Sequence, residues 1–572
     1  MRFEALVTDY DGTLAHHGTV ADSTVAALER LKASGRRLVL VTGRLLPDVR
    51  DAFPRLDLFD RVVAENGALL YRPDTREEKL LAAAPPAAFV EALRRAGVSP
   101  LGVGRVIVAT REPHEHTVLG IIHDLGLELQ VIFNKGAVMI LPATVNKATG
   151  LKAALDELTL SPHNAVGIGD AENDHAFLAL CEASVAVANA LPMVQEQADL
   201  VTSGAQGDGV DELIDRLLAD DLASLTDRLG RHDILMGRLA SGEDVRLRAF
   251  GPLLLVAGPS GSGKSTLVTG IVERLLENAY QVCLVDPEGD YQRLGDALVL
   301  GDATRAPALV EVLEALSKPD RSVVVNLVAV PVGDRPGFCQ GLLPRLDELR
   351  AETGRPHWIV VDEAHHLLPA DWRPAGQVLI RDLHSLVAVT VHPGMLSPAL
   401  LQAMSQVAAI GADPGETMRP LEPAWQAKVP RDLPGALEPG LAARWRRGKP
   451  SVEVFRVEPS RTERLRHRRK YAAGELPADM SFWFRGPDER LNLRAQNLQL
   501  FAQIGAGVDA GTWVHHLENG DYERWFGDVI KDDDLARVAA EARRARTEQD
   551  APPEASRRAI LDAIDERYTA PA

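Results

Sequence analysis

The chain has 572 residues, and its 46% hydrophobic and 25% charged residues are the proportions of an ordinary globular protein. This composition excludes a largely disordered chain, and the formal net charge of -18 argues against a protein whose whole surface binds nucleic acid. At roughly 100 to 200 residues per domain, the length predicts about three to five folded units. The three cysteines, Cys181, Cys283 and Cys339, form no paired metal or redox motif, and we expect them to be buried.

The first residues, Met-Arg-Phe-Glu-Ala-Leu-Val-Thr-Asp, do not contain the apolar core of a signal peptide. The sequence also has no run of the ~18 apolar residues that a bilayer-spanning helix needs. We therefore expect a cytoplasmic enzyme without a membrane partner.

Residues 1–215 alternate short apolar runs with helical stretches, which predicts a parallel sheet flanked by helices. Between residues 73 and 142 the rhythm changes to a compact block that contains its own strands, at 105–109 and 131–133. We interpret this block as a cap inserted into the first domain.

Charged and polar motifs follow the predicted strands of this region in a fixed order. Asp9-Tyr-Asp11-Gly-Thr follows the apolar residues 5–7 after one threonine, at the carboxyl end of a strand, where ligands bind in open α/β sheets. The later members of the set are Thr42 after the second strand, Lys147 at the start of a helix, and Asp170 and Asp174 after another strand.

The four carboxylates of Asp9, Asp11, Asp170 and Asp174 are expected to gather near one point. Like charges ~4 Å apart repel by about 4 kcal/mol even at an effective dielectric near 20, so that a cation must offset them. Oxygen ligands and a phosphate substrate favour Mg²⁺. The sequence therefore predicts a magnesium site.

This ordered set of motifs resembles the haloacid dehalogenase superfamily of phosphatases, in the branch with a small C2-type cap between the second and third motifs. The resemblance covers residues 1–215. It implies that Asp9 attacks phosphorus to form an aspartyl-phosphate, and that Asp11 protonates the leaving group and later takes a proton from water. It also implies that Thr42 and Lys147 hold the transferring phosphoryl oxygens.

The same resemblance implies that Asp9, the Tyr10 carbonyl and Asp170 bind Mg²⁺, supported by Asp174 and Asn173. Because the cap is short, we expect a small phosphorylated metabolite, for which phosphoglycolate and sugar phosphates both stay open. The cap carries a polar cluster, residues 111–116, that we interpret as a loop or helix start in preference to a substrate-binding site.

A second alternating region follows. Residues 216–249 look helical and suit a connector, and residues 250–450 are predicted to form a P-loop ATPase domain. Five apolar runs predict the strands of its nucleotide-binding sheet. They lie at 253–257, 282–286, 322–326, 358–362 and 386–390.

A glycine-rich run lies between the first of these strands and a predicted helix at 267–276, the context that defines a P-loop. We expect ATP as the ligand, with its phosphates at the helix N-terminus. Lys264 is expected to reach the β- and γ-phosphates, and Ser265 to bind Mg²⁺. The predicted nucleotide-binding residues are Gly258, Gly261, Gly263, Lys264, Ser265 and Thr266.

Two acidic residues end the strand at 358–362. Asp362 is expected to steady Mg²⁺, and Glu363 to orient or activate the attacking water. The extra strand at 322–326, together with this glutamate, resembles the ATPase division that includes RecA-like motors. Asp362-Glu-Ala-His365 also spells a helicase box, but the sequence has no companion helicase motifs, which makes a helicase less favoured.

A closer resemblance comes from Asp286-Pro-Glu-Gly-Asp-Tyr291, which is similar to the HerA and VirB4 group of translocating ATPases. His392 follows the fifth strand, where that group often has a polar sensor, and a structural histidine is an equal alternative. Arg381, Arg419 and Arg444 are available as arginine fingers, but none can be assigned, which leaves the oligomeric state open.

The last part of the chain divides into a basic linker, residues 451–480, and a small, mostly helical domain, residues 481–572. Six of the ten residues from Arg461 to Lys470 are basic, which favours a solvated face over contacts with nucleic-acid phosphates. A helical face at 498, 501 and 504 and three tryptophans predict a buried aromatic core. The tryptophans are Trp483, Trp513 and Trp525.

The predicted fold class is therefore α/β: a Rossmann-like core with a small α+β cap, a RecA-like P-loop domain and a small helical domain. The favoured function is a Mg²⁺-dependent phosphatase fused to a domain that binds and hydrolyses ATP. Two alternatives stay open. They are a nucleic-acid-associated ATPase motor that carries a phosphatase domain, and a small-molecule kinase that opposes the phosphatase, although no acceptor-site signature supports the kinase.

Overall fold

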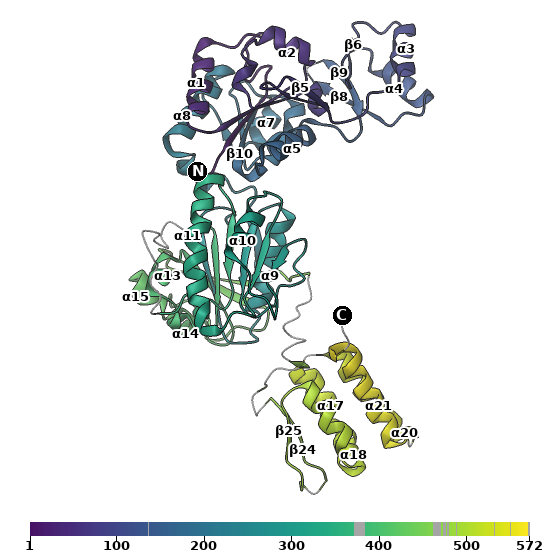
Figure 1. Cartoon of the computed structure of the whole chain (residues 1–572), viewed down its shortest axis with the longest axis vertical. Coiled ribbons are helices and arrows are strands. Elements are labelled where there is room, and N and C mark those ends of the chain that lie inside the picture. The colour runs from purple at the N-terminus through teal and green to yellow at the C-terminus, as the bar shows by residue number, and fades with distance from the viewer. Residues whose placement is uncertain are drawn as a thin grey trace. The chain divides into compact units, whose positions relative to one another are not determined.

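The computed structural model of this chain forms two compact units (Figure 1). The first unit comprises Met1–Glu288 and Leu294–Arg461, and the second comprises Gly289–Arg293 and Thr462–Ala572. The structure describes residues 1–134, 136–370, 384–461, 471–472, 476, 480–487, 489–530, 532–549 and 551–569.

The first unit begins with a sheet of eight strands among the described residues, in the order β12-β11-β10-β1-β2-β3-β4-β5. The strands are β1 (Ala5–Thr8), β2 (Arg37–Val41), β3 (Arg61–Ala64), β4 (Leu69–Arg72), β5 (Glu77–Leu80), β10 (Ala165–Gly169), β11 (Ala183–Ala186) and β12 (Leu200–Val201). Six of them are parallel, and β4 and β5 add an antiparallel hairpin. The helices that flank this sheet are α1 (Asp22–Ala33), α2 (Leu46–Ala52), α5 (Lys147–Leu158), α6 (His175–Leu180), α7 (Pro192–Gln197) and α8 (Gly207–Asp220).

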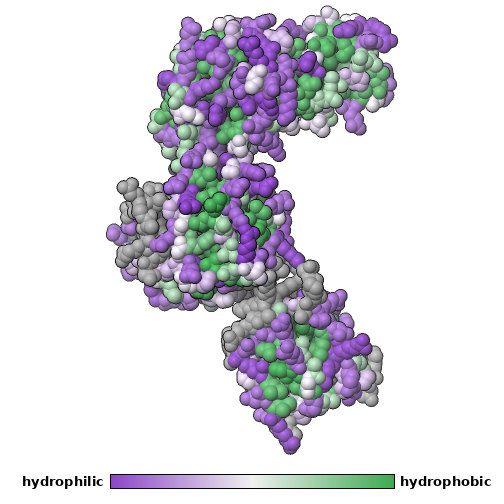
Figure 2. Space-filling view, viewed as in Figure 1, coloured by the Kyte–Doolittle hydropathy of each residue, from purple (hydrophilic) through white to green (hydrophobic). Residues whose placement is uncertain are grey.

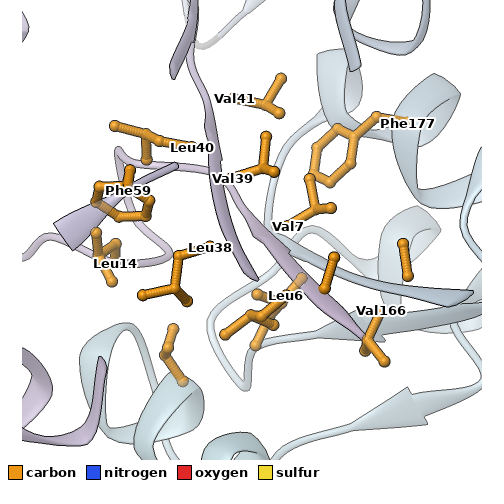
Figure 3. Packing of buried hydrophobic residues seen from close by; sticks show 14 of the residues in the cluster. Leu6, Val7, Leu14, Leu38, Val39, Leu40, Val41, Phe59, Val166 and Phe177 are labelled. Atoms are coloured by element: carbon orange, nitrogen blue, oxygen red, sulfur yellow. The ribbon is translucent and has the colours of Figure 1, made fainter. Parts of the chain in front are cut away.

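The central strands of this sheet are continuous apolar runs, because helices on both faces bury every side chain. All four residues of β1 are buried, and Leu6 and Val7 are fully shielded from solvent. Figure 3 shows these side chains packed with those of β2 and with Phe177 from α6. This rigid core fixes the carboxyl ends of β1, β2 and β10, which carry the predicted phosphatase motifs.

The cap is a four-stranded antiparallel sheet with two helices. Its elements are α3 (Ala87–Arg95), β6 (Gly102–Val103), β7 (Val108–Arg111), α4 (Glu115–Asp124), β8 (Leu129–Asn134) and β9 (Ala137–Pro142). The predicted cap range also contained β5, which instead pairs with β4 at the edge of the first sheet. Sequence patterning missed β5 because all four of its side chains are exposed, as suits a charged edge strand.

Residues 216–249 were predicted to be a helical connector, and this prediction is wrong over their second half. Helix α8 ends at Asp220, and the chain then forms a hairpin of β13 (Ile234–Leu239) and β14 (Asp244–Leu247). Buried residues alternate with exposed ones along β14, which is the period of two that a sheet requires. In β13 the alternation is interrupted at Met236 and Gly237, which are both buried and lie at a shift in the register of the pairing. Gly242 turns the chain with a φ of +89°.

This hairpin extends a second, eleven-stranded sheet with the order β14-β13-β23-β22-β21-β15-β20-β19-β16-β18-β17 among the described residues. Its further strands are β15 (Leu253–Ala257), β16 (Val282–Asp286), β17 (Leu298–Leu300), β18 (Val323–Asn326), β19 (Trp358–Val361), β20 (Leu386–Thr390), β21 (Gln406–Ile410), β22 (Leu441–Arg446) and β23 (Val452–Val457). The five strands expected from the sequence are all present. The sheet continues past the predicted boundary at residue 450, because β23 pairs with both β22 and β13.

Helices pack beside this second sheet. They are α9 (Lys264–Glu277), α10 (Leu309–Leu316), α11 (Arg335–Thr353), α12 (Ala364–Leu367), α13 (Pro398–Ala403), α14 (Pro414–Met418) and α15 (Leu421–Trp425). Strand β20 lies between the P-loop strand β15 and the acidic strand β19 and is parallel to both. The α/β fold class predicted for the first and second regions is thus confirmed.

The second unit contains a short hairpin and a set of helices. They are β24 (Phe482–Phe484), β25 (Leu493–Ala495), α17 (Leu498–Gly507), α18 (Ala510–Glu518), α19 (Asp521–Arg524), α20 (Asp533–Gln549) and α21 (Pro553–Ile564). Trp513 and Trp525 are buried in its aromatic core, and each indole N–H donates a hydrogen bond, to Ser556 and to the Met480 carbonyl. Trp483 is half-buried.

Hydrophilic residues cover much of the visible face of the molecule, with smaller hydrophobic areas between them (Figure 2). Within the described residues, the helices are either too short or too polar to cross a bilayer. Most of the predicted basic run, residues 462–470, lies outside the described residues.

Candidate functional sites

The first candidate site lies at the carboxyl ends of β1 and β10. Strand β1 delivers Asp9, and the amide N–H of Asp9 donates to the Ile168 carbonyl of β10, so that the two strand ends are tied together. Asp9, Asp170 and Asp174 bring their carboxylate oxygens to within 4.8 Å of one another. All three side chains are buried at this edge of the sheet.

Backbone and side-chain donors hold these carboxylates in place. Asp174 Oδ2 accepts hydrogen bonds from the amides of Asp170 and Ala171, both at 2.9 Å. The Thr13 hydroxyl donates to Asp170 Oδ1 at 3.2 Å. Such donors fix the orientation of the acidic groups before any ligand arrives.

Lys147 is the cation of this cluster. It opens α5, and its Nζ donates to Asp9 Oδ1 at 2.5 Å and to Asp174 Oδ1 at 2.6 Å. Burial alone would lower the pKa of Lys147, but the charges and hydrogen bonds of Asp174 and Asp9 raise it. Burial and the neighbouring Asp174 charge raise the pKa of Asp9. The cluster thus holds more negative charge than one ammonium group balances.

Asp11, the predicted acid and base, lies at the rim of the site with 48% of its side chain exposed. Both of its oxygens accept hydrogen bonds of 2.6 Å from the forked guanidinium of Arg44. The Arg44 guanidinium also lies over the Tyr10 ring, 4.9 Å from its centre. Sequence reasoning missed this role of Arg44, although the residue belongs to the Thr42-Gly43-Arg44 motif.

Thr42 is buried two residues before Arg44, and its hydroxyl accepts the Arg44 amide at 3.2 Å. Tyr10 differs from the expectation, because its carbonyl accepts the amides of Leu14 and Ala15 inside the turn that follows Asp9. The lone pairs of this carbonyl are therefore already used, and Tyr10 is not available as the expected metal ligand. Asn173, the expected support, donates to Asn66 at 3.1 Å.

Glu65 is a further residue that the sequence did not single out. It follows β3, its side chain is 1% exposed, and its backbone φ is +53°. Its carboxylate accepts the backbone amides of Arg105, Val106 and Ile107 in the cap, at 2.9, 2.8 and 3.0 Å. One buried carboxylate thus fastens the cap to the core beside Thr42. The polar cluster at 111–116 instead lies at the start of α4, as expected.

The second candidate site is the loop between β15 and α9. Gly258, Gly261 and Gly263 have φ values of +153°, +76° and +100°, which only glycine adopts readily. A Cβ atom at Gly258 would lie 2.0 Å from the Ile410 carbonyl oxygen. Lys264 begins the helix, and its Nζ donates to the carbonyls of Gly258 and Pro259. The predicted P-loop residues are therefore together, with Ser265 half-buried and Thr266 exposed on the first turn of the helix.

Asp362 and Glu363 follow β19 and are buried. Glu363 has a φ of +43°, a strained conformation that often marks a functional residue. His365 Nδ1 lies 3.6 Å from Glu363 Oε2 and 3.2 Å from the Thr390 hydroxyl of β20. His392 is close by, because its amide donates to the same hydroxyl and its ring centre is 5.7 Å from that of His365.

The three arginines considered as fingers differ in their surroundings. Arg444 is buried, pairs with Glu453 and donates to the Arg246 carbonyl, so that it supports the sheet and is not available. Arg419 is exposed and pairs with Glu416. Arg381 lies outside the described residues.

Comparisons with known proteins agree with the first site. The family of haloacid dehalogenase-like hydrolases matches residues 6–94 and 111–214. A phosphoglycolate phosphatase of Methanothermobacter thermautotrophicus is 30% identical over 223 residues, which are 37% of this chain and 98% of that protein. One from Haloarcula marismortui is 32% identical over 218 residues, 36% of this chain and 95% of that protein. The chain belongs to the haloacid dehalogenase-like hydrolases, and its first region is a phosphatase-type hydrolase.

A solved haloacid dehalogenase-like hydrolase from Bacteroides thetaiotaomicron is 18% identical, with a TM-score of 0.34, over 38% of this chain and 99% of that chain. The central domain of helicase HerA matches residues 236–330. This match begins in β13, ahead of the predicted boundary at 250, which agrees with the pairing of the β13–β14 hairpin to the second sheet. A HerA-type, P-loop ATPase-like domain thus follows the hydrolase.

Proposed function

We propose that this chain hydrolyses a small phosphorylated metabolite through an aspartyl-phosphate in a Mg²⁺-dependent reaction, and that its HerA-type domain binds and hydrolyses ATP. The observation that carries the proposal is the buried convergence of Asp9, Asp170, Asp174 and Lys147. Three converging carboxylates, two of which bind the ammonium group of Lys147, fit a centre that takes up a divalent cation and a phosphate ester.

The donor set fits Mg²⁺. This ion prefers hard oxygen ligands, a few of them carboxylates, together with phosphate and water oxygens. Asp9, Asp170 and Asp174 would hold it, and the repulsion between them, which together with burial raises the pKa of Asp9, would be relieved. When bound, the ion would neutralise charge on the transferring phosphoryl group.

In the first half of the reaction, an Asp9 oxygen forms a bond to phosphorus while the bond to the substrate's alcohol oxygen breaks. Asp11 gives its proton to that leaving oxygen. Lys147 and Thr42 stabilise the phosphoryl oxygens, and Lys147 shifts its hydrogen bonds from the carboxylates to the phosphoryl group as charge moves outward.

In the second half, Asp11 takes a proton from a water molecule, whose oxygen attacks phosphorus. The Asp9–phosphorus bond breaks, and inorganic phosphate leaves. Because Asp11 is held by Arg44 in this structure, it must leave this pair in order to carry a proton. We therefore assign Arg44 the role of holding the deprotonated Asp11 carboxylate at the rim between the two halves of the reaction, until a water molecule gives it a proton.

For the substrate we propose phosphoglycolate as the first compound to test. The support is the similarity to phosphoglycolate phosphatases over nearly their whole length. The cap that Glu65 fastens over the core also favours a small ester over a large one. Sugar phosphates form the comparison set.

The test is a screen of phosphorylated metabolites with and without ATP. Phosphate release from phosphoglycolate should need Mg²⁺, stop with a chelator and be absent in Asp9→Asn, while Lys264→Ala, which changes only the nucleotide site, retains it. Release that continues unchanged in Asp9→Asn would disprove the aspartyl-phosphate mechanism.

A second candidate function is a nucleic-acid-associated motor that carries a phosphatase domain, which the match to the HerA central domain favours. ATP turnover that rises on addition of DNA, and is lost in Lys264→Ala and Glu363→Gln, would support it. ATP turnover that DNA leaves unchanged would favour a domain that senses or uses ATP for the phosphatase itself.

A further inference from the structure

A buried polar cluster joins the two halves of the first unit: the phosphatase half, residues 1–229, and the ATPase half, residues 234–461. Glu182 of the phosphatase half accepts hydrogen bonds from Arg2 at 2.8 Å, from His163 at 2.7 Å and from the Tyr280 hydroxyl of the ATPase half at 2.7 Å. The His163 and Tyr280 rings are stacked, with centres 3.7 Å apart. Arg2, His163, Glu182 and Tyr280 are named the junction here.

His163 is held by both halves at once. Its Nδ1 faces the Glu182 carboxylate, and its Nε2 lies 2.6 Å from the backbone carbonyl of Asn278, the C-cap residue of α9. Both partners are acceptors, so each ring nitrogen of His163 faces a group that takes a hydrogen bond. Burial would raise the pKa of Glu182, but His163 and Arg2 lower it well below its usual range.

The same group could be considered as a metal site, because His163, Glu182 and His232 bring ligand atoms to within 4.8 Å of one another. The distances argue against this. Both nitrogens of His163 are at hydrogen-bond distance from acceptors, and Arg2 already balances part of the carboxylate charge. A divalent ion would leave this buried group with an excess of positive charge, which is costly. The junction is therefore a hydrogen-bonded ion cluster.

Two further contacts reinforce the joint. His357, which precedes β19, accepts the Gln281 amide at Nδ1 and donates from Nε2 to Asn164 at 3.2 Å. Arg355 donates to the Thr159 carbonyl at 3.1 Å. The turn at 162–164 is thus fixed to the start of two central strands of the ATPase sheet, β16 and β19.

Each phosphate site is one secondary-structure element away from the junction. His163 and Asn164 directly precede β10, a strand of about 17 Å whose far end carries Asp170. Asn278 ends α9, a helix of about 21 Å whose first residue is Lys264. Such elements move as rigid bodies, so a displacement at one end reaches the other.

We propose that the junction couples the two phosphate sites, with His163 as the positioning residue. A nucleotide on the P-loop moves α9, and the Asn278 carbonyl carries His163 and the start of β10 with it, which changes the placement of Asp170. This inference rests on the proposed function, because it concerns the rate at the phosphatase site. If the nucleotide changes the affinity of the phosphatase site for its ester, thermodynamic linkage requires the ester to change the nucleotide affinity by the same factor, whereas an effect on kcat carries no such requirement.

The experiment measures KM and kcat of the full chain for p-nitrophenyl phosphate with Mg²⁺, with and without a non-hydrolysable ATP analogue. We expect the analogue to change kcat/KM about fivefold or more, the usual range of coupling between sites. Lys264→Ala should remove this response, which shows that the analogue acts through the P-loop and does not compete at the phosphatase site.

The junction variants are Tyr280→Phe, which loses one hydroxyl and keeps the stacked ring, and His163→Gln, which cannot donate to both partners. Both should bring the response towards onefold while a fluorescent analogue still binds. His123→Gln, on the exposed face of α4, is the matched control and should keep the full response. A bound analogue without any response in the unmodified chain would overturn the coupling, and so would a response in both junction variants as large as that of the unmodified chain. Failure to hydrolyse any ester would instead disprove the proposed function, and this inference with it.

Discussion

The two phosphate sites of this chain use different chemical groups. The phosphatase site gathers charged side chains from separate elements, and buried donors such as the Asp170 and Ala171 amides orient them. The P-loop offers backbone N–H groups, whose geometry depends on glycines with positive φ. Function should therefore fail when a functional group is removed from the first site, and when a side-chain atom is added to the second.

The largest effect is expected from removing the nucleophile. Asp9→Asn keeps the size of the side chain but cannot form the aspartyl-phosphate, so kcat for phosphate release should fall by about 10⁴-fold or more. Steady-state phosphate release measures this, with the chain's nucleotide affinity as the control for folding. A loss below tenfold would contradict the claim that the phosphatase site depends on the Asp9 carboxylate.

Removing the proton carrier should cost about 10²- to 10⁴-fold in kcat for an alkyl phosphate. Asp11→Asn should lose less in forming the aspartyl-phosphate from p-nitrophenyl phosphate, because that leaving group departs without a proton. Pre-steady-state bursts with the two esters separate this step. Equal losses in the burst rates would show that Asp11 does not act as the acid.

Adding one carbon atom to the P-loop tests the second half of the comparison. Gly258→Ala places a Cβ 2.0 Å from the Ile410 carbonyl oxygen and should cost more than about 4 kcal/mol in the free energy of unfolding, with loss of ATP binding. Gly261→Ala is the control, because no described atom lies within 4 Å of its Cβ. It should cost about 1 to 2 kcal/mol, from its φ of +76° alone. Denaturant unfolding distinguishes the two, and equal costs would refute the steric explanation.

The cap latch should have a smaller effect. Glu65→Ala leaves three cap amides without their acceptor and should raise KM by about tenfold, since one charged hydrogen bond contributes about 1.5 to 3 kcal/mol and water replaces part of it. Glu65→Gln keeps one acceptor oxygen, and its KM should lie between those of the unmodified chain and Glu65→Ala. A change in kcat without a change in KM would mean that Glu65 acts on the chemistry.

The smallest effect concerns the thiols. Burial raises the pKa of Cys181, Cys283 and Cys339 to about 12, so that all three are protonated at pH 8. Iodoacetamide should label none of them in the folded chain and all three in denaturant, as mass spectrometry of the peptides would show. Cys181 reports on the phosphatase half and the other two on the ATPase half. Rapid labelling of one half would identify it as the less stable.

Sequence motifs indicated that Asp9, Asp170 and Asp174 converge, because each motif follows an apolar strand and parallel strands bring their carboxyl ends together. Asp11, which was expected in the same cluster, instead lies at the rim in an ion pair with Arg44. Sequence patterns also predicted β15, β16, β18, β19 and β20. The edge strand β5 was missed because its four side chains are exposed and three of them are charged, and the β13–β14 hairpin was missed because its charged residues are also typical of a helix surface.

The sequence did not predict which residues far apart in the chain are in contact. The fork between Arg44 and Asp11, the three cap amides on Glu65 and the ring of His163 between two halves all join residues that no local pattern relates. Of these contacts, only that of Glu65 has a signal in the local sequence, which is the glycine of the Glu65-Asn66-Gly67 turn. It places a glycine with φ +106° where a Cβ would overlap the Asn146 carbonyl.

The pairing of β13 with β23 has a practical consequence for dissecting the chain. The first and the last strand that the ATPase half contributes to its sheet, β13 and β23, are hydrogen-bonded neighbours. A fragment that begins at residue 250 would lack β13 and β14. The backbone donors and acceptors of β23 would then be exposed at the edge of the sheet, where another chain could pair with them and cause aggregation. A fragment that begins near residue 230 keeps that edge covered, and is where separate study of the nucleotide site should start.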